Sequence, residues 1–347
     1  MADVTFNPIQ PLATEQQLAK HWPDTLLPFW RQMQHGQFAG VAGVPIHYSY
    51  HLTPGAHTAW VISSGRIETA IKYSELMLEL TTAGYSVFIL DHRGQGRSGR
   101  MLPDSQLGYV ADFADYQHDL ESFLRQVVKP AAHQKHVLLA HSMGAAIAAG
   151  LITQPPWQEW QSFFCAAILC SPMFGIYTGK VPSNVAEPLA QLYCQLRRWW
   201  QPNAPRYFPM QLAYKDKAFA NNELTHSQAR YQALRHCYQT EPQLQLGGVT
   251  CAWLHQAILA MKRLRRSAQH CQTPVLLLQA GADQVVANRA QQAWFKQLPT
   301  ALPHSFKIIE GAKHELLMEQ DNLRQQALAH INQFLQQLST QPENALK

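Results

Sequence analysis

Three residues of the types that catalyse acyl transfer, a serine, an aspartate and a histidine, each follow an apolar run in this sequence. Ser142 lies in the segment Ala140-His141-Ser142-Met143-Gly144, between the apolar run 137–139 and a stretch of small residues, 145–150. A sharp turn from strand to helix lifts such a serine clear of its sheet, and the positions two before and two after it must be small. Ala140 and Gly144 meet that requirement. The pattern predicts that Ser142 is a nucleophile.

The base and the carboxylate that a nucleophilic serine needs come later in the chain. Asp283 follows the apolar run 275–278, and His314 follows the run 306–309. A serine hydroxyl is a weak nucleophile until a base takes its proton, and a carboxylate holds that base in the required tautomer. Three such residues in this order, each after its own apolar run, indicate a catalytic triad far more specifically than any one of them alone. We expect His314 to be the base and Asp283 its partner.

Other side chains near these positions have alternative interpretations, since the chain has 17 histidines. Taken alone, His314 would more often be a surface histidine, but its place in the series favours catalysis. His141 is adjacent to Ser142 and is expected to point away from it. His304 precedes its strand, which makes it a poor base. Glu315 is expected to face solvent or to have a structural role.

Acyl transfer also requires two donors for the oxyanion of the tetrahedral intermediate. The backbone N–H of Met143, at the start of the helix after Ser142, is the first candidate. The second is the backbone N–H of Arg66, because Gly65 allows close approach in the loop after the apolar run 60–62. The alternative is that Gly65 only forms an ordinary turn into the next helix.

The elements that must position these residues are short apolar runs alternating with helical patterns. Alternation from Phe38 to Tyr50 predicts a hairpin. Helical spacing occurs at 71–80 and 113–124. This alternation predicts an α/β protein with a mostly parallel sheet and helices on both faces. The other predicted strands are 60–62, 85–90, 136–140, 163–169, 275–278 and 306–309.

The alternation is interrupted by an insertion of about 100 residues that shows helical and loop patterns but no convincing strand. We therefore expect a hydrolase core of residues 1–172 and 273–347 and a helical cap of residues 173–272. The last helix of the insertion is the clearest, with an apolar stripe from Trp253 to Leu264. Prolines break helices, so short helices are expected in the first half. These prolines are Pro182, Pro188, Pro202, Pro205 and Pro209.

Composition excludes several classes of protein. The chain has 347 residues, of which 46% are hydrophobic and 15% charged, against roughly 25% charged in ordinary globular proteins. Disorder and coiled coil are therefore poor fits. The longest apolar stretches, 163–170 and 144–152, are far shorter than the roughly 20 residues that span a bilayer. The six cysteines form no Cys-x-x-Cys pair and the histidines match no zinc template, so neither metal nor cofactor is expected.

The net charge of +5 is unevenly distributed. Residues 177–272 contain 12 Lys and Arg against 4 Asp and Glu, a net charge of +8. Cations beside amphipathic aromatic side chains are typical of proteins that contact an anionic lipid surface or headgroup. The alternative is that the cations only complement helix C-termini and that the tryptophans belong to the core. We expect peripheral membrane contact and no nucleic acid. The candidates are Arg197, Arg198, Trp199, Trp200, Lys262, Arg263, Arg265 and Arg266.

Six segments carry a resemblance to a known family. They are residues 64–68, 91–100, 140–144, 171–176, 224–231 and 311–315. At these motifs the sequence resembles the monoacylglycerol-lipase-like branch of the α/β-hydrolases, and within it the bacterial inner-membrane lysophospholipases of the L-two type. The resemblance implies an α/β-hydrolase fold with a helical cap. It implies hydrolysis of the acyl ester of a lysophospholipid by a Ser-His-Asp triad, at the cytoplasmic face of the inner membrane.

One departure from the family pattern bears on the oxyanion site. Ser63-Ser64-Gly65 lacks the His-Gly pair common in the wider branch. The alternative functions are a monoacylglycerol lipase or general carboxylesterase, which would use the same triad, and a non-catalytic protein that binds lipid or a partner. Oligomeric state, acyl-chain length and headgroup preference are left open.

Overall fold

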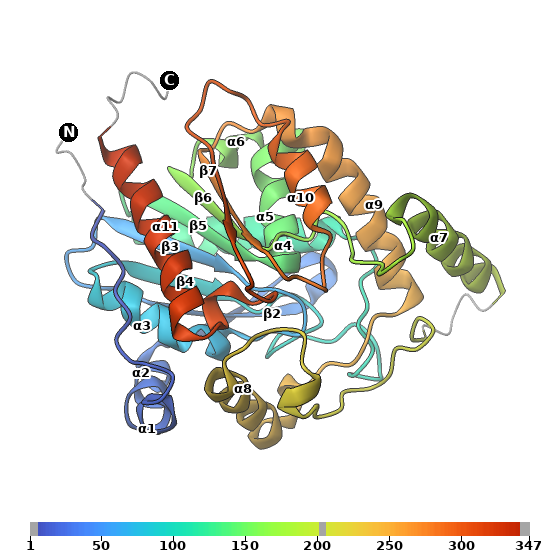
Figure 1. Ribbon diagram of the computed structural model, residues 1–347, viewed down its shortest axis with the longest axis horizontal. Coiled ribbons are helices and arrows are strands. Elements are labelled where there is room, and N and C mark those ends of the chain that lie inside the picture. The colour runs from blue at the N-terminus through green and yellow to red at the C-terminus, as the bar shows by residue number, and fades with distance from the viewer. Residues whose placement is uncertain (1–5, 201–205, 341–347) are drawn as a thin grey trace.

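An eight-stranded sheet runs through the centre of the protein in the computed structural model, which describes residues 6–200 and 206–340 (Figure 1). The strand order is β1-β2-β4-β3-β5-β6-β7-β8. The pairs β1–β2 and β2–β4 are antiparallel and the other neighbours are parallel, so the carboxyl ends of β3 to β8 meet at one edge. The strands are β1 (Gln34–Ala39), β2 (Pro45–His51), β3 (Thr58–Ser63), β4 (Ser86–Leu90), β5 (Lys135–His141), β6 (Ala166–Cys170), β7 (Val275–Ala280) and β8 (Ser305–Ile309).

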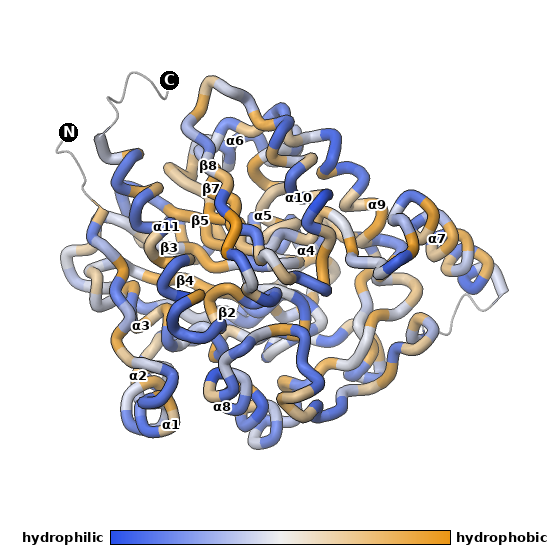
Figure 2. Tube along the Cα trace, viewed as in Figure 1, coloured by the Kyte–Doolittle hydropathy of each residue, from blue (hydrophilic) through white to orange (hydrophobic). Residues whose placement is uncertain are grey.

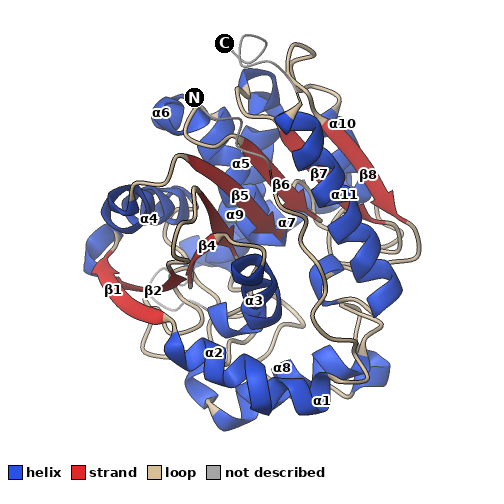
Figure 3. Ribbon diagram, turned by 90° about the vertical axis from the view of Figure 1, so that its left-hand side faces the viewer, coloured by secondary structure: helices blue, strands red, loops and turns tan. Residues whose placement is uncertain are grey.

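A hydrophobic core fills each side of the sheet, because successive residues of a strand point to opposite faces. In β3, Ala59 and Val61 belong to one core, and Trp60 and Ile62 belong to the other. Figure 3 shows the helices on both sides of the strands. The first core is covered by α4 (Ala114–Phe123), α5 (Ser142–Thr153), α6 (Gln158–Gln161), α9 (Cys251–Ser267) and α10 (Asn288–Phe295). The second is covered by α1 (Leu18–His21), α2 (Leu27–Gln32), α3 (Ser74–Thr82), α8 (Gln228–Thr240) and α11 (Asp321–Ser339).

The central helix α5 has no polar face. All of its residues from Ser142 to Thr153 are buried, whereas outer helices such as α11 carry both polar and apolar stretches (Figure 2). Its small residues let it approach the sheet and α4 closely. A Cβ added at Gly150 would collide with the side chain of Gln117 from α4. This close packing fixes the position of the residue that begins α5, which is Ser142.

The predicted α/β class is confirmed, including the antiparallel hairpin that opens the sheet and the parallel strands that follow. Each predicted run overlaps a strand. The largest shifts are at β1, which begins at Gln34 rather than at Phe38, and at β6, which begins at Ala166 rather than at Phe163. The helices α1 and α2 were not expected from the sequence. Leu18, Trp22 and Trp30 of that region are buried against the core that also holds α3.

The segment between β6 and β7 forms three α-helices and no strand within its described residues. The prediction of short, proline-broken helices is wrong for α7 (Ser183–Trp200), which continues through Pro188 over 18 residues. A proline in a helix removes one backbone hydrogen bond, to the carbonyl four residues earlier. That residue, Asn184, is exposed in the first turn, where water can take the place of the missing donor. Pro202 and Pro205 lie outside the described residues.

The three helices of this segment pack differently. Helices α8 and α9 contribute to the cores on opposite sides of the sheet. Helix α7 lies against α9 at the edge of the molecule (Figure 1) and adds only Cys194 to the core that holds α9. The division into a core of residues 1–172 and 273–347 and a cap of residues 173–272 stays a prediction. No helix of the described residues is long and apolar enough to cross a membrane.

Candidate active site

Ser142 stands at the turn between β5 and α5 in a strained backbone conformation. Its φ is +51°, which a non-glycine residue rarely adopts and which costs on the order of 1–3 kcal/mol. Gly144 makes the turn possible, because a Cβ there would collide with the carbonyl oxygens of Ser63 and Ser64 at the end of β3. The structure therefore holds Ser142 at the carboxyl edge of the sheet, in the sharp turn that the small neighbouring residues predict.

His314 lies within hydrogen-bonding distance of both of the other residues that the sequence places in series. His314 Nε2 is 2.9 Å from Ser142 Oγ, and His314 Nδ1 is 2.7 Å from Asp283 Oδ2. The other oxygen of Asp283 accepts the backbone N–H groups of Val285 and Val286, which fixes the carboxylate in its loop. This arrangement can pass a proton from Ser142 to His314 while Asp283 stabilises the resulting imidazolium.

The two predicted oxyanion donors lie on the segments that follow β5 and β3. As the second residue of α5, Met143 has no helical carbonyl one turn earlier to bind, so its N–H is available. The loop before Arg66 is held by Glu68, whose Oε2 accepts the N–H of Gly65 at 2.5 Å. Gln95 Nε2 donates to the Gly65 carbonyl at 2.7 Å. These contacts hold in place the loop that carries the Arg66 N–H.

A buried cluster of charged and titratable side chains lies beside the triad. Lys72 Nζ is 2.8 Å from both Glu68 Oε1 and Glu315 Oε1. His141 points away from Ser142, as expected: its Nδ1 is 2.8 Å from Glu68 Oε1 and its Nε2 is 3.2 Å from the backbone oxygen of His314. Of the two roles expected for Glu315, the structural one applies, since its side chain is buried. The cluster thus joins the oxyanion loop to the loop of the catalytic histidine.

The members of this cluster favour one another's charged forms. Burial disfavours the carboxylate of Glu68, but Lys72 and His141 outweigh that effect and hold its pKa well below the ordinary value. Burial likewise opposes the charge on His141, yet Glu68 raises its pKa overall. For Lys72, burial is outweighed by Glu315 and Glu68, which raise its pKa. The cluster is not among the features predicted from the sequence, although Glu68 and Lys72 have a spacing that pairs charges on a helix.

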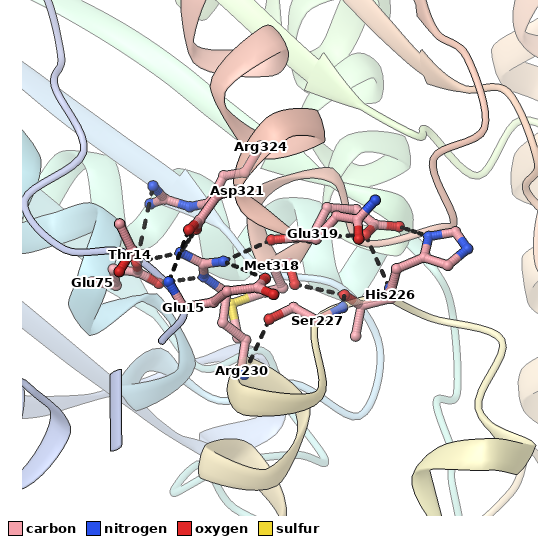
Figure 4. Close-up of polar contacts among 12 residues, drawn as sticks. Thr14, Glu15, Glu75, His226, Ser227, Arg230, Met318, Glu319, Asp321 and Arg324 are labelled. Carbon is pink, nitrogen blue, oxygen red and sulfur yellow. Dashed lines mark hydrogen bonds and ion pairs between the residues drawn. The ribbon is translucent and has the colours of Figure 1, made fainter. Parts of the chain in front are cut away.

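The loop of His314 is tied to the segment before α8 through Glu319, which is fully buried (Figure 4). Glu319 Oε1 accepts the Lys313 N–H at 2.8 Å and lies 2.9 Å from His226 Nδ1. Its Oε2 accepts the backbone N–H groups of His226 and Gln320 at 2.9 and 3.0 Å. The residue just before the catalytic histidine is therefore held by a carboxylate that also binds the insertion.

A second set of contacts fastens the same part of the insertion to the core. Arg230, at the first turn of α8, is 1% exposed and makes a bidentate pair with Glu75 of α3 at 2.8 and 2.9 Å. It also donates to Asp321 and to the Glu319 carbonyl. Ser227 caps α8 by accepting the Arg230 N–H (Figure 4). The only indication of this segment in the sequence is the resemblance of residues 224–231 to the family motif.

Ser142 and His314 open into a cavity of about 680 Å³. Much of the cavity wall is apolar, and the wall also includes several arginine and lysine side chains. The apolar residues include Met173, Ile176, Phe208, Leu212, Leu234, Leu246, Val249, Trp253, Leu254, Val285 and Val286. Among the described residues, no cluster of three His, Cys, Asp or Glu side chains could hold a metal ion.

The eight residues predicted to contact a headgroup or membrane do not line this cavity. Two of them link α9 to α7: Lys262 donates to Gln191 at 2.6 Å, and Arg265 pairs with Glu187 at 2.9 Å. Arg198 is exposed at the end of α7, Arg197 is half-buried there, and Trp199 and Trp200 are 80% and 81% exposed. Arg263 and Arg266 are exposed on α9.

Comparison with known proteins assigns this site to a family. Residues 55–321 match the profile of the Hydrolase_4 family, described as "Serine aminopeptidase, S33". Lysophospholipase L2 of Escherichia coli K12 is 38% identical over 318 residues, covering 89% of both chains. The protein belongs to this serine hydrolase family. The probable lysophospholipase L2 of Haemophilus influenzae is 30% identical and matches 89% of this chain and 94% of its own.

The fold is also shared with solved structures of more distant proteins. A monoglyceride lipase from Saccharomyces cerevisiae superposes with a TM-score of 0.66 at 19% identity, covering 90% of this chain and 96% of its own. This likeness shows the α/β-hydrolase fold. The arrangement of Ser142, His314 and Asp283 therefore occurs in a protein that belongs to a serine hydrolase family and has the α/β-hydrolase fold.

Proposed function

We propose that this protein hydrolyses the fatty-acyl ester of lysophospholipids, releasing a fatty acid and a glycerophospho-alcohol. The observation that carries the proposal is the hydrogen-bonded series Ser142–His314–Asp283, of which Ser142 and His314 lie in the wall of a largely apolar cavity. Such a cavity accommodates an acyl chain, and the charged and polar part of the wall suits a headgroup. The lysophospholipase L2 relatives support the same substrate class.

The geometry supports a mechanism in two steps. In the first, His314 Nε2 takes the proton of Ser142 Oγ as that oxygen attacks the acyl carbonyl, while the N–H groups of Met143 and Arg66 donate to the oxyanion. The ester bond breaks, and His314 returns the proton to the departing alcohol oxygen. In the second, water loses a proton to His314 and attacks the acyl carbonyl; the bond to Ser142 Oγ then breaks, His314 returns the proton to Ser142, and the fatty acid leaves. Asp283 holds Nδ1–H of His314 throughout.

Monoacylglycerol hydrolysis is the second candidate, because an uncharged monoacyl lipid fits the same triad and because the fold resembles that of a monoglyceride lipase. The test compares kcat/KM of the purified protein for lysophosphatidylethanolamine and for a monoacylglycerol with the same acyl chain. We expect the lysophospholipid to be the better substrate. A clear preference for the uncharged lipid would replace the proposed function with the second candidate.

We also propose that the protein takes its substrate from an anionic membrane surface through α7. One face of this helix exposes Val185, Leu189, Leu192 and Leu196, which recur every three or four residues, followed by Trp199 and Trp200. Arg197 and Arg198 lie beside these residues. An apolar helical face flanked by cations and tryptophans is suited to the interfacial region of an anionic bilayer.

Vesicle sedimentation tests this membrane contact. The double variant Trp199→Ser/Trp200→Ser is expected to bind vesicles containing anionic phospholipid several-fold more weakly than the parent protein. The matched control Leu12→Ser/Leu52→Ser removes two apolar side chains that are 41% and 48% exposed elsewhere. Equal binding by the parent protein and the tryptophan variant would refute the proposed contact.

A further inference from the structure

The guanidinium of Arg66 lies in the wall of the catalytic cavity without a carboxylate partner among the described residues. Its Nη2 donates to the carbonyl of Gly247 at 2.7 Å, and its Nε is buried with no hydrogen-bond partner. Burial lowers the pKa of Arg66 to about 10, and only the phenols of Tyr116 and Tyr207 oppose that effect. A buried cation without a counter-charge is costly, which makes this position suited to an anionic ligand.

The surroundings hold this guanidinium in one place. It lies over the ring of Trp253 at 5.1 Å from the ring centre, a cation–π distance. Gly108 leaves the space that it occupies, because a Cβ there would collide with Nη2. The hydroxyl of Tyr207, which lies against Gly247, is likewise buried without a partner. Two hydrogen-bond donors around Gly247 therefore lack acceptors.

Other cations line the same cavity and outnumber the free acids. Arg235 lies against the rings of three tyrosines and forms no ion pair among the described residues; its Nη1 donates to the Tyr214 hydroxyl at 3.3 Å. Lys215 and Lys217 also contribute to the wall. Of the acids in the wall, Glu68 and Glu315 both pair with Lys72, and Glu68 pairs with His141 as well, which leaves Glu223. The cavity thus carries positive charge beside its apolar surface.

We propose that the Arg66 side chain binds the phosphate of the lysophospholipid headgroup and so distinguishes phosphate-bearing from uncharged monoacyl lipids. This inference rests on the proposed function. The backbone N–H of Arg66 is the proposed second oxyanion donor, so its side chain starts at a residue that would bind the ester carbonyl. The two non-bridging oxygens of a phosphodiester match the planar fork of a guanidinium. Arg235 and the two lysines add to the attraction.

The first test compares two substrates with the same acyl chain, lysophosphatidylethanolamine and monoacylglycerol, in Arg66→Met and Arg66→Lys. Loss of a charge-assisted hydrogen bond predicts that Arg66→Met lowers kcat/KM for the phospholipid roughly 10- to 100-fold more than for the uncharged lipid. Arg66→Lys keeps the charge but loses the fork, so its effect is expected to be intermediate. Labelling of Ser142 by a fluorophosphonate verifies that each variant is folded. Arg289→Met, at an exposed arginine of α10, is the control.

The second test does not depend on lysophospholipid turnover. The compound sn-glycero-3-phosphoethanolamine carries the phosphate without the acyl chain and is expected to inhibit hydrolysis of a soluble uncharged ester. We expect its inhibition constant to rise at least tenfold in Arg66→Met and to be unchanged in Arg289→Met. An unchanged constant in Arg66→Met overturns the inference. If the parent protein prefers monoacylglycerol but the constant still rises, the proposed function fails while the phosphate site stands.

Discussion

Replacing Glu319 by glutamine tests whether the loop of the catalytic histidine depends on its link to the insertion. Each carboxylate oxygen of Glu319 takes two contacts in the structure. Oε1 accepts the Lys313 N–H and lies beside the His226 ring, and Oε2 accepts the N–H groups of His226 and Gln320. Figure 4 shows Glu319 beside His226. An amide has one acceptor oxygen and one donor NH₂ group. In either orientation, Glu319→Gln therefore turns a donor toward at least one backbone N–H.

The expected cost follows from these contacts. A buried donor left without an acceptor costs about 1–3 kcal/mol, and the remaining bonds weaken by about 1 kcal/mol in total when the acceptor loses its charge. We expect Glu319→Gln to lower the free energy of unfolding by about 2–4 kcal/mol. Because Lys313 directly precedes His314, the same change shifts the imidazole. A displacement of about 1 Å at a catalytic group costs roughly 100-fold in turnover.

Two measurements verify these expectations: urea denaturation, and kcat and KM for a soluble uncharged ester. We expect a lower denaturation midpoint and a fall in kcat that exceeds any change in KM. Glu310→Gln is the matched control, since it makes the same substitution at an exposed position four residues before His314. This prediction is refuted if Glu319→Gln has the same denaturation midpoint as the parent protein and a kcat within about twofold of the parent's. The link between the insertion and the His314 loop would then contribute to neither stability nor catalysis.

Three further predictions concern the triad, the elbow and the buried cluster. Asp283→Asn is expected to lower kcat about ten-thousandfold, because the wrong tautomer of His314 is then favoured. Steady-state kinetics measure this fall, and a much smaller fall would contradict the role of Asp283. Gly144→Ala is expected to prevent accumulation of folded protein, since its Cβ meets backbone atoms of β3; a folded, active variant would contradict this. Lys72 and His141 hold the pKa of Glu68 well below its ordinary value, and Glu68 raises the pKa of His141. Stability from this pair is therefore lost as pH falls through the lowered pKa of Glu68 and as pH rises through the raised pKa of His141. Urea denaturation between about pH 6 and pH 9 should show the free energy of unfolding of the parent protein decreasing as pH rises, with no such decrease in Glu68→Gln.

Those features that depend on local rules could be predicted from the sequence. The small residues around Ser142 require a tight turn, and apolar runs of strand length require buried strands. The order of Ser142, Asp283 and His314 then follows from the positions of these residues after their strands. The sheet brings the three together because its parallel strands end at the same edge.

Features that depend on distant pairing could not be predicted in this way. Glu315 and Lys72 are far apart in the sequence, and nothing near either residue indicates that they share a buried site. The same holds for Arg230 and its partner Glu75. Helix α7 continues through Pro188 because water can reach the carbonyl of Asn184, and it also packs against α9, a distant contact that local helix rules do not include.

The central claim is that Ser142 carries the acyl group of a lysophospholipid during turnover. Rapid acid quenching of the protein with lysophosphatidylethanolamine, followed by mass spectrometry of the digested peptides, measures this directly. We predict a fatty-acyl group on the peptide that contains Ser142, absent from Ser142→Ala. Turnover of the lipid with the acyl group on another residue, or undiminished turnover by Ser142→Ala, would contradict the account.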